Sequence, residues 1–235
     1  MSLADAVVVV AGAGGGAGAA VVRRLSAAGA IVVTADRSLD STDDLVREIG
    51  EAGGQIDAYA IDLLDGPITK AWADSVTARF GRVDGVVHLV GGWRGGKGIT
   101  ETDLDDWNWL SGLLVSTVQN TTRAFHDQLR SSPLGRFVLV SAAEASHPTA
   151  KNASYAAAKA AAEAWTLAVA DSFHGSQAAA TIVVVKALVT PAMREAKPDA
   201  AFKGCTDVID LAGTIVGLWD KPADEVNGER VWLTT

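Results

Sequence analysis

The stretch AVVVVAGAGGGAG, residues 6–18, decides the fold. Ala6–Ala11 is a short apolar run rich in valine, which is typical of a strand buried on both faces of a sheet. The glycine-rich turn Ala11–Gly18 follows at once, and Gly16–Gly29 reads as a helix of small residues that ends at glycine. In such a unit the backbone N–H groups of the turn and the helix N-terminus can hold a pyrophosphate. A merely flexible turn would contain the same glycines, so the rest of the chain must decide whether this turn binds a dinucleotide.

Strand-like and helix-like segments alternate from this unit to the end of the chain. Short β-branched runs predict the strands Ala6–Ala11, Ala30–Ala35, Ile56–Ile61, Val83–Val90, Arg136–Ser141, Ala179–Val185 and Arg230–Leu233. Periodic segments bounded by glycine or proline predict the helices Gly16–Gly29, Asp43–Ala52, Pro67–Phe80, Leu104–Arg130, Ser154–Phe173 and Thr206–Asp220. This alternation predicts one α/β domain over residues 1–235, doubly wound and Rossmann-type, with a seven-stranded parallel sheet.

Composition excludes several classes of partner. The 235 residues include 20 Lys and Arg against 28 Asp and Glu, a formal charge of −8, which argues against nucleic acid and anionic membranes. A single cysteine, Cys205, excludes an intrachain disulfide framework and fits a reducing cytosol. The charge-free stretch 7–22 is interrupted by five glycines, unlike a membrane span. The four histidines have no spacing suited to a metal. We therefore expect a cytoplasmic protein with a small-molecule partner and no metal.

Two acidic residues end neighbouring predicted strands. Asp36 follows the second strand, where a carboxylate would meet the adenosine ribose hydroxyls of a dinucleotide and repel a 2′-phosphate. This favours NAD(H). The adjacent Arg37 could pair with that phosphate, which keeps NADP(H) as an alternative, or could be a solvated loop residue. Asp62 ends the third strand and could face the adenine edge with Leu63 on the ring, or could simply cap a turn.

Tyr155 and Lys159 form the third signal. Four residues apart on a helix, the phenol and the ammonium lie on one face. A phenol with a pKa near ~10 is a poor acid–base catalyst at neutral pH, and an adjacent cation brings that pKa toward the working range. Because this helix follows the fifth strand, the pair is expected at the carboxyl edge of the sheet, where dinucleotide ligands bind.

Taken together, these motifs resemble the short-chain dehydrogenase/reductase family. The turn AGAGGGAG is similar to the family's T-G-x-x-x-G-x-G, with Ala11 in place of threonine. The resemblance implies an enzyme in which Tyr155 and Lys159 are catalytic: the tyrosine exchanges the proton, and the lysine holds the nicotinamide ribose. It also implies a set of cofactor-binding residues, namely Gly12, Gly14, Gly16, Ala17, Gly18, Asp36, Arg37, Asp62, Leu63, Gly91, Gly92, Lys159 and Thr190.

The chain also departs from the family pattern. The serine usual thirteen residues before the tyrosine is Ala142, with Ser141 one residue earlier and facing the other way if the strand continues. The asparagine usual in the long helix is Leu114. The usual N-A-G reads Leu89-Val90-Gly91, and the usual Pro-Gly reads Val185-Lys186.

One branch of the family shares these departures. LVGGWRGG, Leu89–Gly96, resembles the A-G-G-W-x-G-G segment of quinonoid dihydropteridine reductases. TPAMREAKPDAAF, residues 190–202, resembles that branch's T-P-M and the Pro-acidic-Ala-x-Phe stretch after it, and the final WLTT resembles the V-T-T of its last strand. The resemblance implies a quinonoid dihydropteridine-like or related heterocyclic substrate bound by Trp93, Ala142 and Tyr155. Trp93 could offer a stacking surface for a flat ring or could pack within its own loop.

Two rival functions remain open at this stage. One is a ketone or aldehyde reductase, or an alcohol dehydrogenase, in which Ser141 or Ser146 replaces the missing serine. The other is an NAD(H)-binding sensor without turnover. The family resemblance further implies a homodimer or homotetramer, because Leu104–Arg130 and Ala156–Phe173 correspond to the helices of its four-helix interface.

Overall fold

The structure, a computed structural model, describes residues 3–234, so Met1, Ser2 and Thr235 of the predicted domain lie outside it. Seven parallel strands form the main sheet in the order β3-β2-β1-β4-β5-β6-β9, which confirms the predicted α/β fold. Their bounds are β1 Val7–Ala11, β2 Ile31–Asp36, β3 Ile56–Ala60, β4 Gly85–His88, β5 Arg136–Ala142, β6 Ala179–Val185 and β9 Arg230–Trp232.

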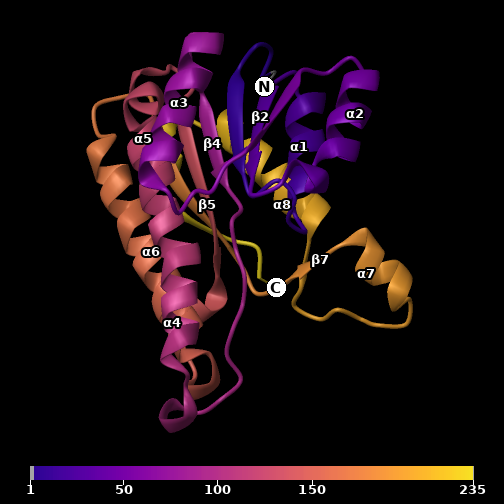
Figure 1. Ribbon diagram of the computed structural model, residues 1–235, viewed down its shortest axis with the longest axis vertical. Helices are drawn as coiled ribbons and strands as arrows, with labels where there is room; N and C mark the ends of the chain where they lie inside the picture. The colour runs from indigo at the N-terminus through magenta and orange to yellow at the C-terminus, as the bar shows by residue number, and fades with distance from the viewer. Residues whose placement is uncertain (1–2, 235) are drawn as a thin grey trace.

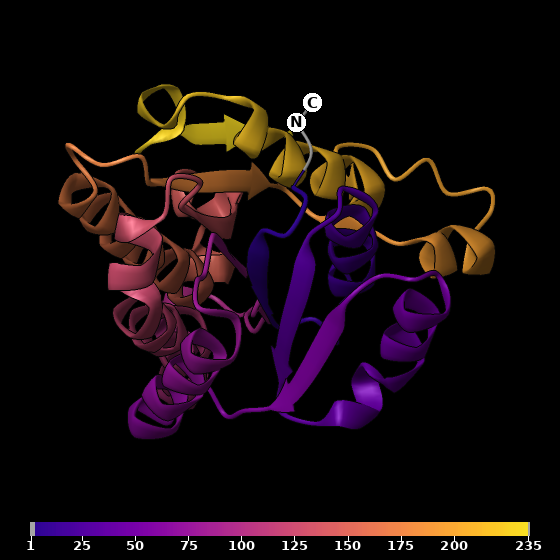
Figure 2. The same cartoon turned by 90° about the horizontal axis from the view of Figure 1, so that it is seen from above.

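Helices cover both faces of this sheet (Figures 1 and 2). On one side lie α3 Gly66–Phe80, α4 Leu104–Ser111, α5 Thr117–Ser131 and α6 Ala153–Ser172, and on the other α1 Gly18–Ala27, α2 Asp43–Glu51 and α8 Val208–Gly217. Shorter elements complete the described chain: β7 Leu188–Val189, α7 Pro191–Ala196, β8 Thr206–Asp207, α9 Ala223–Val226 and the one-turn helices η1 Leu39–Ser41, η2 Ile99–Glu101, η4 Ala143–Ala145, η5 Ala150–Asn152 and η6 Leu218–Asp220.

The valines of β1 show why the sheet needs two helical layers. Val8 and Val10 are buried in the core beneath α1 and α8, whereas Val7 and Val9 are buried in the core beneath α3 and α5. Successive side chains of a strand point to opposite faces, so an all-apolar strand is stable only when both faces are covered.

Two predicted helices differ from the structure. The segment expected as one helix over Leu104–Arg130 contains a π-helical turn, Gly112–Ser116, between α4 and α5. The helix predicted over Thr206–Asp220 begins only at Val208, because Thr206 and Asp207 pair with β7 in a separate two-stranded sheet. The Asp207 carboxylate then caps α8 by accepting from the N–H of Ile209 at 2.9 Å.

The strand order reverses direction between β1 and β4. From β1 the chain goes outward through β2 and β3, and then crosses back to β4 and continues through β5 and β6. All these strands are parallel, so their carboxyl ends meet at one edge of the sheet, where α/β proteins bind ligands. In the described chain, 3–234, no helix is both long and apolar enough to cross a membrane.

Candidate active site

A cavity of about 670 Å³ opens at the carboxyl edge of the sheet. One end lies between β1, β2 and β3, and we call it the adenosine end; the other lies between β5, β6 and α6, and we call it the reacting end. Most of the site residues expected from the sequence line this cavity: Gly12, Gly14, Gly16, Ala17, Asp36, Arg37, Asp62, Leu63, Gly91, Gly92, Ala142, Tyr155 and Lys159.

The glycine-rich turn fits a bound pyrophosphate because its backbone is bare and packed closely against the segment that follows β4. Gly12 has a φ of +85°, and a Cβ there would lie 2.8 Å from the backbone nitrogen of Val90. Gly18, which does not line the cavity, lets α1 start directly against the carbonyl of Ala13, where a Cβ would collide. A dinucleotide needs this close backbone approach followed by a helix N-terminus.

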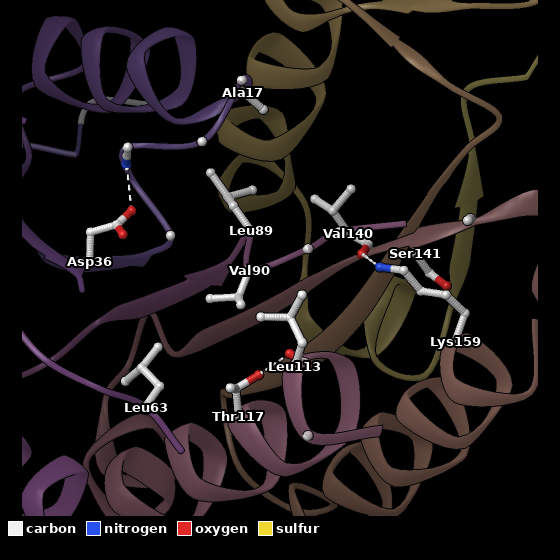
Figure 3. Close-up of a pocket in the computed structure, with 18 of the residues that line it drawn as sticks. Ala17, Asp36, Leu63, Leu89, Val90, Leu113, Thr117, Val140, Ser141 and Lys159 are labelled. Carbon is white, nitrogen blue, oxygen red and sulfur yellow. Dashed lines mark hydrogen bonds between the residues drawn. The ribbon is translucent and has the colours of Figure 1, made fainter. Parts of the chain in front are cut away.

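Asp36 ties the second strand to this turn. Its carboxylate accepts the N–H of Gly14 at 2.9 Å and the N–H of Arg37 at 2.7 Å, so the turn and β2 are held together beside the cavity (Figure 3). Asp62 lines the same end and accepts the N–H of Leu64 at 3.0 Å, the turn role that was its simpler interpretation. Leu63 is buried there, as expected of an apolar wall for a ring.

Lys159 lies at the reacting end with its side chain buried. Its Nζ donates to the carbonyl oxygen of Val140 on β5 at 2.9 Å (Figure 3). Burial lowers the pKa of Lys159 to about 8, although the carboxylates of Glu163 and Glu144 oppose that shift. The ammonium therefore loses hydration by its position at the edge of the sheet.

Tyr155 lies one helical turn before Lys159 and packs on the apolar cluster of Leu110, Leu114 and Ala158. The pKa of this phenol shifts opposite to the sequence-based expectation: burial, with a smaller effect of Glu144, raises it to about 12. Leu114, at the place of the family's asparagine, is buried in that cluster. Tyr155 thus stands in a largely apolar setting that keeps its proton on.

Ser141 lines the cavity, but its hydroxyl is already bonded to a carboxylate. Its hydroxyl donates to Glu163 Oε1 at 2.6 Å, and Glu163 Oε2 accepts from Arg230 Nε at 2.7 Å. Both Ser141 and Glu163 are buried. A serine hydroxyl has one proton to donate, so in this arrangement Ser141 has none left for a substrate carbonyl.

Trp93 and Thr190 lie outside the cavity lining. Trp93 is 60% exposed, whereas Trp109 of α4 lines the cavity and carries the Arg94 guanidinium over its ring at 4.3 Å. Thr190 caps α7 by accepting the N–H of Met193, and its methyl lies 3.6 Å from where a Cβ of Gly16 would be. Thr190 therefore flanks the glycine-rich turn without lining the cavity.

Sequence reasoning missed several residues of the cavity wall. Those from the β6–β7 segment include Lys186, which takes the place of the family's glycine. Those from the α4–α5 region are Asn108, Trp109, Gly112, Leu113 and Thr117. The departure at Val185-Lys186 was visible in the sequence. No periodic signal marked Thr117 as a wall residue, because the π-helical turn shifts the face that α5 presents.

Comparisons with known proteins agree with this geometry. The sequence profile of the short chain dehydrogenase family matches residues 6–201. A curated relative, the 3-oxoacyl-[acyl-carrier-protein] reductase FabG of Thermotoga maritima, is 26% identical over 83% of this chain and 77% of its own length. A metagenomic short-chain oxidoreductase solved with NADP superposes with a TM-score of 0.81 at 25% identity, covering all of both chains.

A further solved structure extends the fold comparison to the other cofactor. The NAD⁺-bound xylitol dehydrogenase superposes with a TM-score of 0.87 at 18% identity, covering 100% of this chain and 99% of that one. These neighbours hold NAD⁺ or NADP, and the residues of this cavity fit such a group at the bare Gly12 turn and at Asp36. A nicotinamide dinucleotide, NAD(H) or NADP(H), therefore fits this cavity.

Proposed function

The chain belongs to the short-chain dehydrogenase/reductase family, and from this premise we propose that it reduces a quinonoid dihydropteridine-like or related heterocyclic substrate with NADH. The observation that carries the proposal is that one cavity joins the glycine-rich turn and Asp36 to Tyr155 and Lys159. Dinucleotide recognition and an acid–base pair thus share a single space, as hydride transfer requires.

Each side chain has a defined task in this proposal. When bound, the cofactor supplies the hydride. Tyr155 holds the proton that the substrate receives, because its raised pKa keeps the phenol protonated at neutral pH. Lys159, oriented by the carbonyl of Val140, holds the nicotinamide ribose. Gly91 and Gly92 flank the cofactor, and Ala142 forms the wall against the substrate.

The apolar wall at the reacting end supports a heterocycle rather than a simple ketone. Ala142 and Leu114 replace polar residues of the family, and Ser141 is bonded to Glu163. A substrate that needs little polarisation of a carbonyl fits this wall best. The rival ketone or aldehyde reductase would depend on Ser146, the remaining candidate serine, which lies beyond η4.

Several finer features are also part of the proposal. NADH is preferred to NADPH because Asp36 faces the site of a 2′-phosphate. Residues 1–235 form a single domain that assembles as a homodimer, or as a homotetramer, through α4, α5 and α6. The lone Cys205 fits a cytoplasmic location. Light scattering at micromolar concentration tests the assembly, and a monomer would contradict it.

The deciding experiment is a substrate screen with purified protein. NADH and NADPH oxidation are followed with quinonoid dihydropterin, other quinonoid heterocycles, ketones and aldehydes. Turnover of the heterocycles above the ketones is the expected result. Turnover of ketones alone would establish the carbonyl reductase. Firm NADH binding without turnover of any compound would contradict the enzyme and favour the NAD(H) sensor.

A further inference from the structure

The charged residues that line the cavity are distributed unevenly between its two ends. At the adenosine end the lining contains Asp36, Arg37 and Asp62, two carboxylates and one cation. At the reacting end it contains Lys159 and Lys186, and no carboxylate of residues 3–234 lines that end. The chain as a whole has a formal charge of −8, so this wall is opposite in sign to the rest of the protein. A cleft lined by one sign of charge attracts a ligand of the other sign.

Lys159 already has partners within the protein. Its side chain is buried, and its Nζ donates to the carbonyl oxygen of Val140 at 2.9 Å. The carboxylates of Glu163 and Glu144 act on it as well, since they raise its pKa against the larger effect of burial. In the proposed reaction this ammonium holds the nicotinamide ribose. It is therefore not the cation that is free to bind a further group.

Lys186 is different in each of these respects. It is exposed, and its ammonium makes no hydrogen bond or ion pair with any residue between 3 and 234. The residues beside it in the cavity wall, Val185, Ala187 and Leu188, are apolar. A lysine ammonium has three donors on a flexible four-carbon stem. The cavity wall thus contains a cation that no group of the described chain neutralises.

The sheet register places Lys186 on the substrate side of the cavity. Val185, the last residue of β6, pairs with Ala142, the last residue of β5. Lys186 is therefore the next residue beyond the wall that the proposed substrate contacts. In the order β1-β4-β5-β6, the strand that leads into the glycine-rich turn is three strand spacings away, about 14 Å at ~4.8 Å per strand. The chain approaches that turn only at Thr190, whose methyl lies 3.6 Å from the position of a Gly16 Cβ.

We propose that Lys186 is a substrate-binding residue, and that it selects substrates with a carboxylate attached to the ring that is reduced. This rests on the proposed oxidoreductase function and narrows its substrate class. The ammonium forms a hydrogen-bonded ion pair with the carboxylate, while the hydride and the proton are exchanged at the cofactor and Tyr155. Lys186 itself forms no covalent bond. Binding of a group that does not react holds the reacting ring in position.

A matched pair of ligands tests this proposal without turnover. Isoquinoline-3-carboxylate and isoquinoline-3-carboxamide share a flat frame and nearly the same shape, and differ in charge. The NADH complex is used because its nicotinamide ring is neutral. Calorimetric titration at low salt should give a Kd about 5-fold lower for the carboxylate than for the carboxamide, the size of a partly exposed ion pair. About 1 M salt, where the Debye length is ~3 Å, should reduce this preference.

Four variants assign the preference to one side chain. Lys186→Met should abolish it, Lys186→Arg should retain it, and Lys186→Glu should reverse it. The control is Lys203→Met, which removes an exposed cation from the same stretch between β6 and α8 but outside the cavity lining. This control should keep the wild-type preference. A preference that survives in Lys186→Met, an equal loss for both ligands, or no preference in the wild-type protein would overturn the proposal.

The cofactor diphosphate is the other anion that Lys186 could bind, and the same variants distinguish it. Weaker NADH binding by Lys186→Met, with the carboxylate preference intact, would assign the ammonium to the diphosphate and overturn the proposal. The oxidoreductase function fails separately, since the substrate screen measures turnover and the titration measures binding alone. For a carboxylate substrate that the wild-type protein reduces, Lys186→Met should raise KM by about 5-fold and change kcat less. A fall in kcat alone would contradict the binding role.

Discussion

The two ends of the cavity hold their polar groups in different ways. At the adenosine end the Asp36 carboxylate accepts two backbone N–H groups, from Gly14 and Arg37, and remains partly open to solvent. At the reacting end Lys159 and Glu163 are buried, and Glu144 keeps an oxygen without a partner. The adenosine end is thus built from backbone geometry, while the reacting end is built from buried side chains, among which Tyr155 and Lys159 have shifted pKa values.

This difference predicts which substitutions change dinucleotide binding and which change proton transfer. Changes at the adenosine end alter how tightly and how selectively the dinucleotide binds. Changes at the reacting end alter proton transfer, because burial has moved the pKa of Tyr155 up and that of Lys159 down. Each experiment below tests whether the two ends behave separately.

Removal of the Tyr155 hydroxyl should give the largest effect. Tyr155→Phe keeps the ring in its cluster with Leu110 and Leu114, and removes only the proton donor. We expect kcat to fall by about 10²-fold or more, the scale of general-acid catalysis, with an almost unchanged Kd for NADH. Steady-state kinetics and calorimetry measure the two values. An unchanged kcat would mean that water protonates the substrate directly.

The pH dependence should report Lys159. Its ammonium is the charged form, and its lowered pKa of about 8 means that the charge is lost as pH rises through that value. We expect kcat/KM for NADH to decline above pH 8, by about 10-fold for each further pH unit. The Tyr155 phenol, with a pKa near 12, stays protonated over this range.

Glu163 provides the internal check on that assignment. Among the charges that raise the pKa of Lys159, the Glu163 carboxylate has the largest effect, ahead of Glu144. In Glu163→Gln the decline of kcat/KM for NADH should therefore begin at lower pH. A decline that stays in place in this variant would assign the titration to another group.

The prediction of the fold from sequence succeeded where each local pattern had one physical interpretation. The valines of β1 and the alternation that follows it required a covered parallel sheet, and the structure has it. The cavity also collects most of the predicted residues, because the carboxyl ends of parallel strands must meet. Burial, in contrast, depends on distant packing, so the shift of the Tyr155 pKa was expected in the wrong direction.

The same distinction explains what sequence did not reveal. Glu144 has no motif, and only the packing of η4 on α6 brings it to Tyr155. The bond from Ser141 to Glu163 joins residues 22 positions apart and leaves no periodic trace. Trp93 was expected against the substrate from a loop motif, while the cavity wall contains Trp109, which the α4 helix supplies.

Gly12 and Gly53 form a matched pair for the adenosine end. Both have positive φ, +85° and +80°, but only at Gly12 would a Cβ meet other atoms within 4 Å. Gly53→Ala should lower the free energy of unfolding by about 1–2 kcal/mol through strain alone. Gly12→Ala should cost more and also weaken NADH binding, by about 10-fold. Thermal melts and calorimetry separate the two effects, and equal results for both variants would exclude close packing of the turn.

The smallest expected effect, and the sharpest comparison of the cofactors, concerns Asp36. Its carboxylate repels a 2′-phosphate at the adenosine end, so NADH should bind several-fold tighter than NADPH, about 1 kcal/mol of preference. Asp36→Ala removes the charge and should narrow or reverse that preference. It also removes the acceptor of the Gly14 N–H, and therefore weakens both cofactors together.

Asp36→Asn separates these two causes. The amide oxygen can still accept the Gly14 N–H, while the charge is gone. If charge sets the preference, Asn should lose it as fully as Ala does and retain more of the NADH affinity. Equal or tighter NADPH binding by the wild-type protein would mean that Arg37, which lines the same end, outweighs Asp36. In both Asp36 variants kcat with saturating cofactor should stay within about twofold of the wild-type value, because Tyr155 and Lys159 lie at the other end of the cavity.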